Sequence, residues 1–416
     1  MTSNFSRRNF LGLLGAGAVL PYAGKLSASV SHNFRIRTIT AGVKLASASD
    51  MGSLQTAAGF LKKSQGQFEA MGYEVQTLRI ATQALAGYLP DWRESASMDK
   101  IKQLDAFAEE HNIMFSLGPA NYAGEDSDDF VSWLAEALSS HNWISSSLVV
   151  ASADNGIDHQ SITDAAKIMA AIAKSTAGGE GNFRFTASAF CRSGTPFFPA
   201  AFFNNDGFSI GLESADLLQQ TFASAGNPRD AIRQLKVNME AALKPIEIHA
   251  EKIAGQTARA YLGIDTSPAP NLDVSIGRAI ETLSGVPFGS PSTLAACAAI
   301  TDVLKSLNIK SCGYSGLMLP ILEDTTLALR AREGSYSVSD LLLFSSVCGT
   351  GLDVVPLAGD ITINQLAALV SDVAALSKKY SKPLSARLFP VPGKKVGDIV
   401  QFANPYLTDS MVMKID

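Results

Sequence analysis

The sequence predicts a mixed α/β protein whose main part is a single domain, folded as a ten-stranded α/β barrel. The chain has 416 residues, of which 46% are hydrophobic and only 18% are charged, so it can bury a large core. Short apolar segments alternate with longer segments of helical periodicity, a pattern typical of parallel sheets with crossover helices. Ten strands are more than an open sheet usually holds without closing or splitting, which favours a barrel.

The ten predicted strands are short and rich in Ile, Val, Phe and Leu, as expected for strands buried on both faces. In chain order they are Arg35–Thr40, Glu74–Ile80, Ile113–Leu117, Ser146–Ala151, Asn182–Ser188, Phe208–Leu212, Ala260–Ile264, Ser315–Leu319, Leu352–Val355 and Leu384–Leu388. The sequence contains no convincing internal repeat, so an eightfold barrel with extra strands remains an alternative.

Six segments between these strands carry apolar residues at helical spacing. They are Leu54–Met71, Met98–His111, Asp128–Leu138, Ile162–Lys174, Pro228–Ala254 and Ile363–Lys379. The fifth has Asn227 as its expected N-cap, with proline at the first helical position, where the missing N–H would have no helical partner in any case.

The first 28 residues resemble a twin-arginine export signal. Arg7 and Arg8 precede an apolar run, Leu11–Leu20, that is rich in glycine and alanine. This run is too short for an ordinary transmembrane helix, which needs about 20 residues. We therefore expect residues 1–28 to direct export to the periplasm and residues 29–416 to form the folded domain.

If this interpretation holds, replacing Arg7 and Arg8 with lysine should leave the precursor in the cytoplasm. The physical reason is that the twin-arginine translocation machinery reads the arginine pair, and it is the transport partner that the sequence implies. Fractionation of cells that express the wild type and the double variant measures the effect. Equal export of both proteins would contradict the interpretation. Cleavage near Ala28 and an uncleaved N-terminal tether are both open.

Charge and motifs argue against several functional classes. The chain has 34 basic and 39 acidic side chains, so it lacks the basic excess that nucleic-acid binding needs. Its cysteines, Cys191, Cys297, Cys312 and Cys348, form no C-x-x-C pair, and none of the histidines has a partner at metal-ligand spacing. A G-x-S-x-G elbow and a phosphate-binding loop are also absent from the sequence.

Acidic residues gather near the ends of several predicted strands, where α/β proteins place their sites. Each has a structural alternative, because carboxylates also cap helices and stabilise turns. We regard Glu213 and Asp353 as candidate acid/base residues and Asp265 as a candidate substrate ligand. A Mg²⁺ or Ca²⁺ on Glu213, Asp216 and Asp265 is a variant, since hard cations prefer oxygen ligands. The residues concerned are Glu213 and Asp216 after the sixth strand, Asp265 after the seventh, Glu323 and Asp324 after the eighth and Asp353 in the ninth.

Arg387 lies in an apolar strand, where a buried guanidinium needs an acidic or anionic partner. We expect it to hold an anionic group of the substrate, and a structural ion pair is the alternative. Cys348 is the candidate nucleophile, with packing in the core as its alternative. It precedes Gly349, Thr350 and Gly351, whose backbone N–H groups could form an anion-binding nest.

Several of these segments, in this order, resemble the uncharacterised family catalogued as domain of unknown function 711. The resemblance runs from about Arg35 to the C-terminus and implies a barrel similar to that of glycyl-radical enzymes such as pyruvate formate-lyase. It implies no established reaction. Thr195, in the first matching segment, joins the expected substrate-binding residues. The matching segments are Gly194–Ala201, Gly211–Asp216, Gly263–Asp265, Ser267–Pro270, Ser315–Pro320, Glu323–Asp324, Cys348–Asp353, Ala386–Leu388 and Pro390–Lys394.

Radical chemistry is not expected despite this resemblance. The segment Ser311–Tyr314 is only faintly similar to the Ser-Gly-Tyr of glycyl-radical enzymes, because it lacks the preceding arginine and valine and lies far from the C-terminus. Export would also separate the protein from an activating enzyme in the cytosol.

Two functions from different classes are consistent with these residues. The first is an enzyme that acts on a small polar or anionic substrate with carboxylates at the barrel mouth. The second is a periplasmic protein that binds a small ligand or anion without catalysis, although no linker suggests the hinge of a two-lobed binding protein. An assembly subunit is a weaker third possibility, and a homo-oligomer is compatible with all three. The sequence identifies neither a substrate nor a cofactor.

Overall fold

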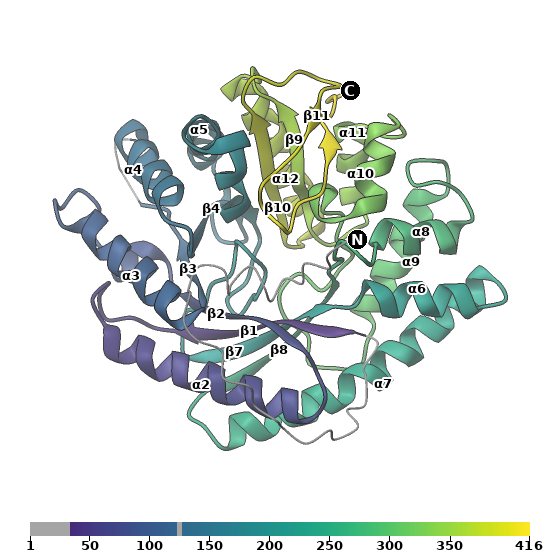
Figure 1. The fold of residues 1–416 in the computed structure, drawn as a ribbon, viewed down its shortest axis with the longest axis horizontal. Coiled ribbons are helices and arrows are strands. Elements are labelled where there is room, and N and C mark those ends of the chain that lie inside the picture. The colour runs from purple at the N-terminus through teal and green to yellow at the C-terminus, as the bar shows by residue number, and fades with distance from the viewer. Residues whose placement is uncertain (1–33, 123–126) are drawn as a thin grey trace, which may run out of the picture.

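The computed structural model describes residues 34–122 and 127–416, so the expected export signal lies outside the described residues. It confirms a mixed α/β fold, and Figure 1 shows a strongly curved sheet with helices around its outer side. In the two described ranges, no helix is both long enough and apolar enough to cross a membrane.

The main sheet has ten strands. Nine follow one another in the order β8-β7-β1-β2-β3-β4-β6-β10-β9, and the short β5 pairs with β4. The strands are β1 (Arg35–Val43), β2 (Val75–Thr82), β3 (Met114–Pro119), β4 (Ile144–Ser152), β5 (Gly156–Ile157), β6 (Phe185–Ala189), β7 (Gly207–Glu213), β8 (Ala260–Pro268), β9 (Gly351–Ala358) and β10 (Leu384–Val391), with a separate pair of β11 (Ile399–Val400) and β12 (Ser410–Met411).

Helices cover the outer face of this sheet and include all six predicted ones. The α-helices are α2 (Met51–Ala70), α3 (Ser97–His111), α4 (Ser127–Ser140), α5 (His159–Ser175), α6 (Ala215–Ser224), α7 (Pro228–Gly255), α8 (Ile276–Ser284), α9 (Thr293–Lys305), α10 (Thr325–Arg332), α11 (Val338–Ser345) and α12 (Ile363–Tyr380). Three 3₁₀ segments, η1 (Leu85–Gly87), η2 (Ala177–Arg184) and η3 (Ile321–Glu323), complete the elements.

The sheet is largely parallel, with two changes of direction. Strands β1, β2, β3, β4 and β6 run parallel to one another. On one side β7 pairs antiparallel with β1 and parallel with β8, and on the other β10 pairs antiparallel with β6 and parallel with β9. The long helical connections explain the parallel pairs, since a parallel neighbour needs a crossover.

The predicted strand Ser315–Leu319 is wrong, because this segment has no regular strand structure. The tenth strand of the sheet is instead the short β5. The chain makes an isolated parallel bridge from Ser311 to Ile264 of β8 and another from Pro320 to Asp353 of β9. Over the described residues the sheet is therefore not a closed barrel, since β8 and β9 are its edges.

Asp265 explains why no strand forms there. Its carboxylate accepts hydrogen bonds from the backbone N–H groups of Tyr314 at 3.0 Å and Ser315 at 2.9 Å, so these groups are not available to a strand ladder. Ser315 also has a φ of 43°, outside the extended range of a strand. The local conformation thus follows from a side chain about fifty residues earlier, as the separation of 49 for the first of these bonds shows.

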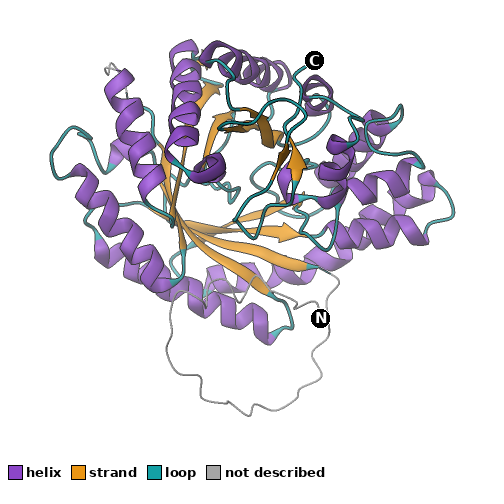
Figure 2. Ribbon diagram, turned by 45° about the horizontal axis from the view of Figure 1, so that its top comes forward, coloured by secondary structure: helices purple, strands orange, loops and turns teal. Residues whose placement is uncertain are grey.

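The inner face of the sheet is covered by loops rather than helices (Figure 2). The segment 190–206 lies across β2 and β3, because Phe203 N–H donates to the carbonyl of Thr82 at 3.0 Å and Ser116 Oγ donates to that of Ala201 at 2.6 Å. Covering on both faces explains why most positions of these two strands are buried, without alternation of buried and exposed residues.

Candidate functional site

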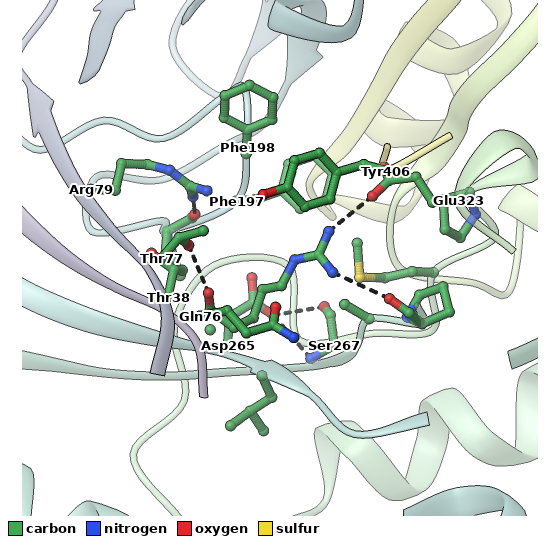
Figure 3. Close-up of a pocket in the computed structure, with 18 of the residues that line it drawn as sticks. Thr38, Gln76, Thr77, Arg79, Phe197, Phe198, Asp265, Ser267, Glu323 and Tyr406 are labelled. Atoms are coloured by element: carbon green, nitrogen blue, oxygen red, sulfur yellow. Dashed lines mark hydrogen bonds and ion pairs between the residues drawn. The ribbon is translucent and has the colours of Figure 1, made fainter. Parts of the chain in front are cut away.

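The described residues form a pocket of about 140 Å³ on the inner side of the sheet (Figure 3). Its wall includes side chains from six strands, β1, β2, β3, β7, β8 and β10. The charged groups in the wall are three arginines and two carboxylates: Arg37, Arg79, Arg387, Asp265 and Glu323.

Four ion pairs form a chain along one side of the pocket. Arg37 contacts Glu213 and Glu323 at 2.9 Å each, and Arg387 contacts Glu323 and Asp353 at 2.7 Å each. Glu323 therefore bridges the two guanidinium groups. This chain unites three of the predicted site residues, Glu213, Asp353 and Arg387, in one network of opposite charges.

Burial makes these pairs interdependent. The Arg387 side chain is 3% exposed and that of Asp353 is 1% exposed. Burial raises the pKa of Asp353, and Arg387 opposes this rise. Burial also acts against the charge of Arg37, but Glu323 and Glu213 outweigh it and the pKa of Arg37 is raised. The acid/base roles of Glu213 and Asp353 stay predictions, and their arginine partners favour the structural alternative.

Arg79, on β2, has a different environment. It is 6% exposed, its guanidinium donates to the carbonyl of Pro196, and it lies 5.1 Å from the ring centre of Phe198. Its Nε is buried without a hydrogen-bond partner, and none of the described carboxylates forms an ion pair with it. Burial, followed by the positive charges of Arg37 and Arg387, lowers the pKa of Arg79 to about 9. An anion in the pocket would stabilise this isolated cation.

Arg259 shows that the surroundings of Arg79 are unusual even among buried arginines. Like Arg79, Arg259 is buried, donates to a backbone carbonyl, that of Gly42 at 2.5 Å, and lies over an aromatic ring, 5.3 Å from the centre of Phe60. The charge that acts on Arg259 is the negative one of Asp206, whereas those that act on Arg79 are positive. Arg259 does not line the pocket and serves as a matched control.

An aromatic wall faces these charges. The rings of Phe183 and Phe198 lie 5.4 Å apart, and Tyr406 stacks on Phe183 at 6.3 Å with the ring planes 8° apart. The guanidinium of Arg387 lies 5.0 Å from the centre of Phe183. Figure 3 shows Arg79 and Phe198 on one side of the pocket and Tyr406 and Glu323 on the other. The pocket thus combines an unpaired cation with a mainly apolar interior.

Asp265 lies in the pocket wall and, among the described residues, forms no ion pair with an arginine. Its Oδ1 accepts hydrogen bonds from Ser267 Oγ at 2.6 Å and from the N–H of Ser315, while Oδ2 accepts one from the N–H of Tyr314. Burial raises the pKa of Asp265, although these hydrogen bonds oppose the rise. Within the described part of the chain, it has no ion-pair partner.

The glycines near Cys348 allow close backbone contacts. A Cβ atom on Gly349 would lie 2.3 Å from the Cα of Gly316, and one on Gly351 would lie 2.3 Å from the carbonyl oxygen of Ser385. A side chain at either position would therefore clash. Thr350 is buried between them, and none of the three is in the pocket wall. Their role in binding an anion stays a prediction, and this placement favours packing.

Cys348 and Thr195 also lie outside the pocket wall. The Cys348 side chain is fully buried in the main hydrophobic core, which corresponds to the packing alternative. Thr195 is buried, forms an isolated bridge with Phe202 and accepts a hydrogen bond from the N–H of Phe197 at 3.4 Å. It thus supports the segment that places Phe197 in the wall. The nucleophile and the substrate-binding roles stay predictions.

The three proposed metal ligands are not arranged around a common point. Glu213 accepts hydrogen bonds from Arg37 at 2.9 Å and Asn271 at 2.7 Å, and Asp265 accepts its bonds from the turn described above. Asp216 is half-buried, and burial raises its pKa to about 6. No group of three or more His, Cys, Asp or Glu in the described ranges is placed to hold a metal ion. Glu213 is paired with Arg37 instead.

Sequence reasoning missed Arg37, Arg79 and the role of Glu323. Both arginines lie in predicted strands, as Arg387 does, and a buried guanidinium in a strand needs an acidic or anionic partner. Of the acidic pair, only Asp324 caps a helix, by accepting hydrogen bonds from the first turn of α10. Glu323 joins the ion pairs instead, a difference that no sequence signal indicates.

Comparison with known proteins identifies relatives but no activity. The sequence pattern of a family described as "Uncharacterised ACR (DUF711)" matches residues 30–404. A UPF0210 protein of Pyrobaculum islandicum is 27% identical over 355 residues, which cover 81% of this chain and 78% of the relative. UPF0210 proteins of Thermoanaerobacter sp. and Listeria monocytogenes are 26% and 25% identical, over 83% and 80% of this chain and 80% and 77% of their own lengths. These names state no ligand and no reaction.

Proposed function

The chain belongs to the uncharacterised family DUF711, and we propose that it is an enzyme that binds a small organic anion in the pocket at Arg79. The observation that carries this proposal is the buried guanidinium of Arg79 in the pocket wall, with positive rather than negative charges around it. Taking a charged group out of water costs several kcal/mol, and the carbonyl of Pro196 and the ring of Phe198 offset only part of this cost. A bound anion would supply the missing partner.

Asp265 is the residue that we propose for proton transfer. Glu213 and Asp353 lie outside the pocket wall and are bonded to arginines, so they are not placed to exchange a proton with a ligand there. Asp265 lies in the pocket wall and has a pKa raised by burial, a property that suits an acid/base group working nearer to neutral pH. If no reaction occurs, the same pocket would serve the alternative function, a protein that binds a small anion without catalysis.

The test of this proposal is anion binding by the wild type and by two arginine variants. We expect at least one anion from a panel of acetate, benzoate, succinate, phosphate and sulfate to raise the melting temperature of the wild type. Arg79→Met should reduce its affinity by about 10- to 100-fold, because a hydrogen bond to a charged group contributes about 1.5–3 kcal/mol. Calorimetric titration measures the affinity.

Arg259→Met is the matched control, since it removes a similarly buried arginine outside the pocket. It should leave anion affinity close to that of the wild type. Arg79→Lys should retain part of the affinity, because it keeps the charge but loses the planar fork of donors. Equal anion affinities in the wild type and Arg79→Met would contradict the proposal.

We also propose the barrel related to glycyl-radical enzymes, exported through the twin-arginine pathway. The support for the barrel is the segment 311–320, which has parallel bridges to β8 and to β9 and would complete five strands opposite the five parallel ones. The support for export is the sequence of residues 1–28 alone. A crystal structure of the protein tests the barrel, and the fractionation experiment above tests export.

A further inference from the structure

We infer that the ligand of this pocket is a ring-sized organic monocarboxylate, with its carboxylate at Arg79 and its apolar body against the aromatic wall. This inference rests on the proposed function and adds the charge, the size and the polarity of the ligand. Three features of the pocket carry it: the number of unpaired cations, the volume and the chemistry of the remaining wall.

The charges favour a single negative group. Arg37 and Arg387 each already contact two carboxylates, so Arg79 is the arginine in the wall that has no acidic partner in the described ranges. Glu323 and Asp265 line the same pocket. A second negative charge on the ligand would face these carboxylates, and like charges in a poorly hydrated site repel strongly.

A second unpaired donor accompanies Arg79. The side-chain nitrogen Nε2 of Gln76 is buried, has no hydrogen-bond partner among the described residues, and belongs to a residue of the pocket wall. Both unpaired nitrogens belong to residues of the pocket wall, where a ligand could supply a hydrogen-bond partner. A carboxylate accepts hydrogen bonds through both of its oxygens, which suits the unpaired guanidinium of Arg79.

The volume and the wall favour an apolar ring. An engineered apolar cavity of about 150 Å³ binds benzene, and this pocket measures about 140 Å³. Phe197, Phe198, Met318 and Leu212 contribute apolar surface, and the sheet register places Met114, another wall residue, beside Arg79. A small, strongly hydrated anion would leave this surface without a partner, whereas a planar ring would bury it.

Calorimetric titration with four matched probes tests this inference on the folded protein. Benzoate carries both the ring and the charge, acetate only the charge, benzyl alcohol only the ring, and phosphate a higher charge without a ring. We expect benzoate to bind at least tenfold more tightly than each of the other three. Arg79→Met should reduce benzoate to the affinity of benzyl alcohol, and Arg259→Met should leave it unchanged.

Ala269→Leu tests the ring separately from the charge. Ala269 lines the pocket beside Phe197 and Met318, and a larger side chain there would take up space that the ring needs. We expect this variant to lose at least tenfold in benzoate affinity while its acetate affinity stays within about twofold. If the variant does not fold, the ratio of benzoate to acetate affinity in the wild type decides whether the ring contributes.

The outcomes separate this inference from the proposed function. Phosphate that binds as tightly as benzoate and depends on Arg79 would overturn the monocarboxylate but keep the anion site. If benzoate binds no more tightly than acetate, or does not bind at all, the inference that the ligand contains an apolar ring is wrong. Anion affinities that do not respond to Arg79→Met would overturn the proposed function itself, and with it this inference.

Discussion

Arg387→Met should lower the free energy of unfolding by about 3–5 kcal/mol at neutral pH, the range observed when one partner of a buried ion pair is removed. The variant would leave Asp353 and one side of Glu323 without their guanidinium partner, at 1% and 6% side-chain exposure. Methionine fills much of the arginine volume, so the loss comes mainly from charge rather than from a cavity. Chemical denaturation followed by circular dichroism measures it.

Acid should reduce this loss. Arg387 lowers the pKa of Asp353, so its removal raises that pKa further above the value in the unfolded chain. At pH values between the pKa of Asp353 in the unfolded chain and its higher pKa in the folded variant, the folded variant binds more protons than the unfolded one. Its stability therefore increases as the pH falls. As the pH falls from neutral toward the raised pKa of Asp353, the difference in stability between wild type and variant should therefore become smaller.

Arg35→Met is the control for this experiment. Arg35 belongs to the same network through Glu213, at 3.3 Å, but its side chain is 42% exposed. Exposed ion pairs contribute about 0–1 kcal/mol, so this variant should lose no more than that. A loss of less than about 1 kcal/mol in Arg387→Met, or a difference that is independent of pH, would show that the buried pairs do not hold the pocket together.

Asp324→Ala should cause a loss of similar size, because one carboxylate caps two helices. Oδ1 accepts hydrogen bonds from the N–H groups of Thr326 and Leu327 at the start of α10, at 3.0 and 2.9 Å. Oδ2 accepts one from Ile276 N–H at the start of α8, at 2.6 Å, and Ser275 Oγ donates to Oδ1 at 2.6 Å. The side chain is fully buried, so alanine would leave several of these donors without water or protein partners.

We expect the free energy of unfolding of Asp324→Ala to fall by about 3–5 kcal/mol, from two lost caps of about 1 kcal/mol each and at least one stranded buried donor at about 1–3 kcal/mol. Asp158→Ala provides the comparison. Asp158 caps α5 alone and is exposed, so its removal should cost about 1 kcal/mol. If both variants lose the same free energy of unfolding, the hydrogen bonds by which Asp324 links α8 to α10 add nothing to stability.

Much of the fold could be predicted because it depends on local patterns. Nine of the ten predicted strands and all six predicted helices are present, since apolar periodicity reflects burial directly. The predicted N-cap Asn227 is confirmed, with its side chain accepting a hydrogen bond from the N–H of Asp230. The exception, Ser315–Leu319, is as apolar as a strand, but the side chain of Asp265 holds the turn that precedes it.

The site was predicted only in part, because a sequence shows which residues carry charge but not which charges meet. Arg387 could be identified as a buried cation in need of an anion, and its partner Asp353 was among the candidates. Cys348 was a candidate partly because glycines follow it in the sequence. In the structure, Gly349 makes a close backbone contact with Gly316. That contact joins two distant segments, so the glycine pattern alone could not reveal its purpose.

The amino-acid sequence is enough to predict the α/β class, the positions of most strands and helices, the family and the presence of buried charge in apolar strands. How these charges are shared depends on the folded arrangement of the chain. Ion pairs and hydrogen bonds act over about 3 Å, whereas Arg37 and Glu323 are 286 residues apart in the chain. Only the order and register of the strands bring Arg37 and Arg387 to carboxylates and leave Arg79 to face the pocket without one.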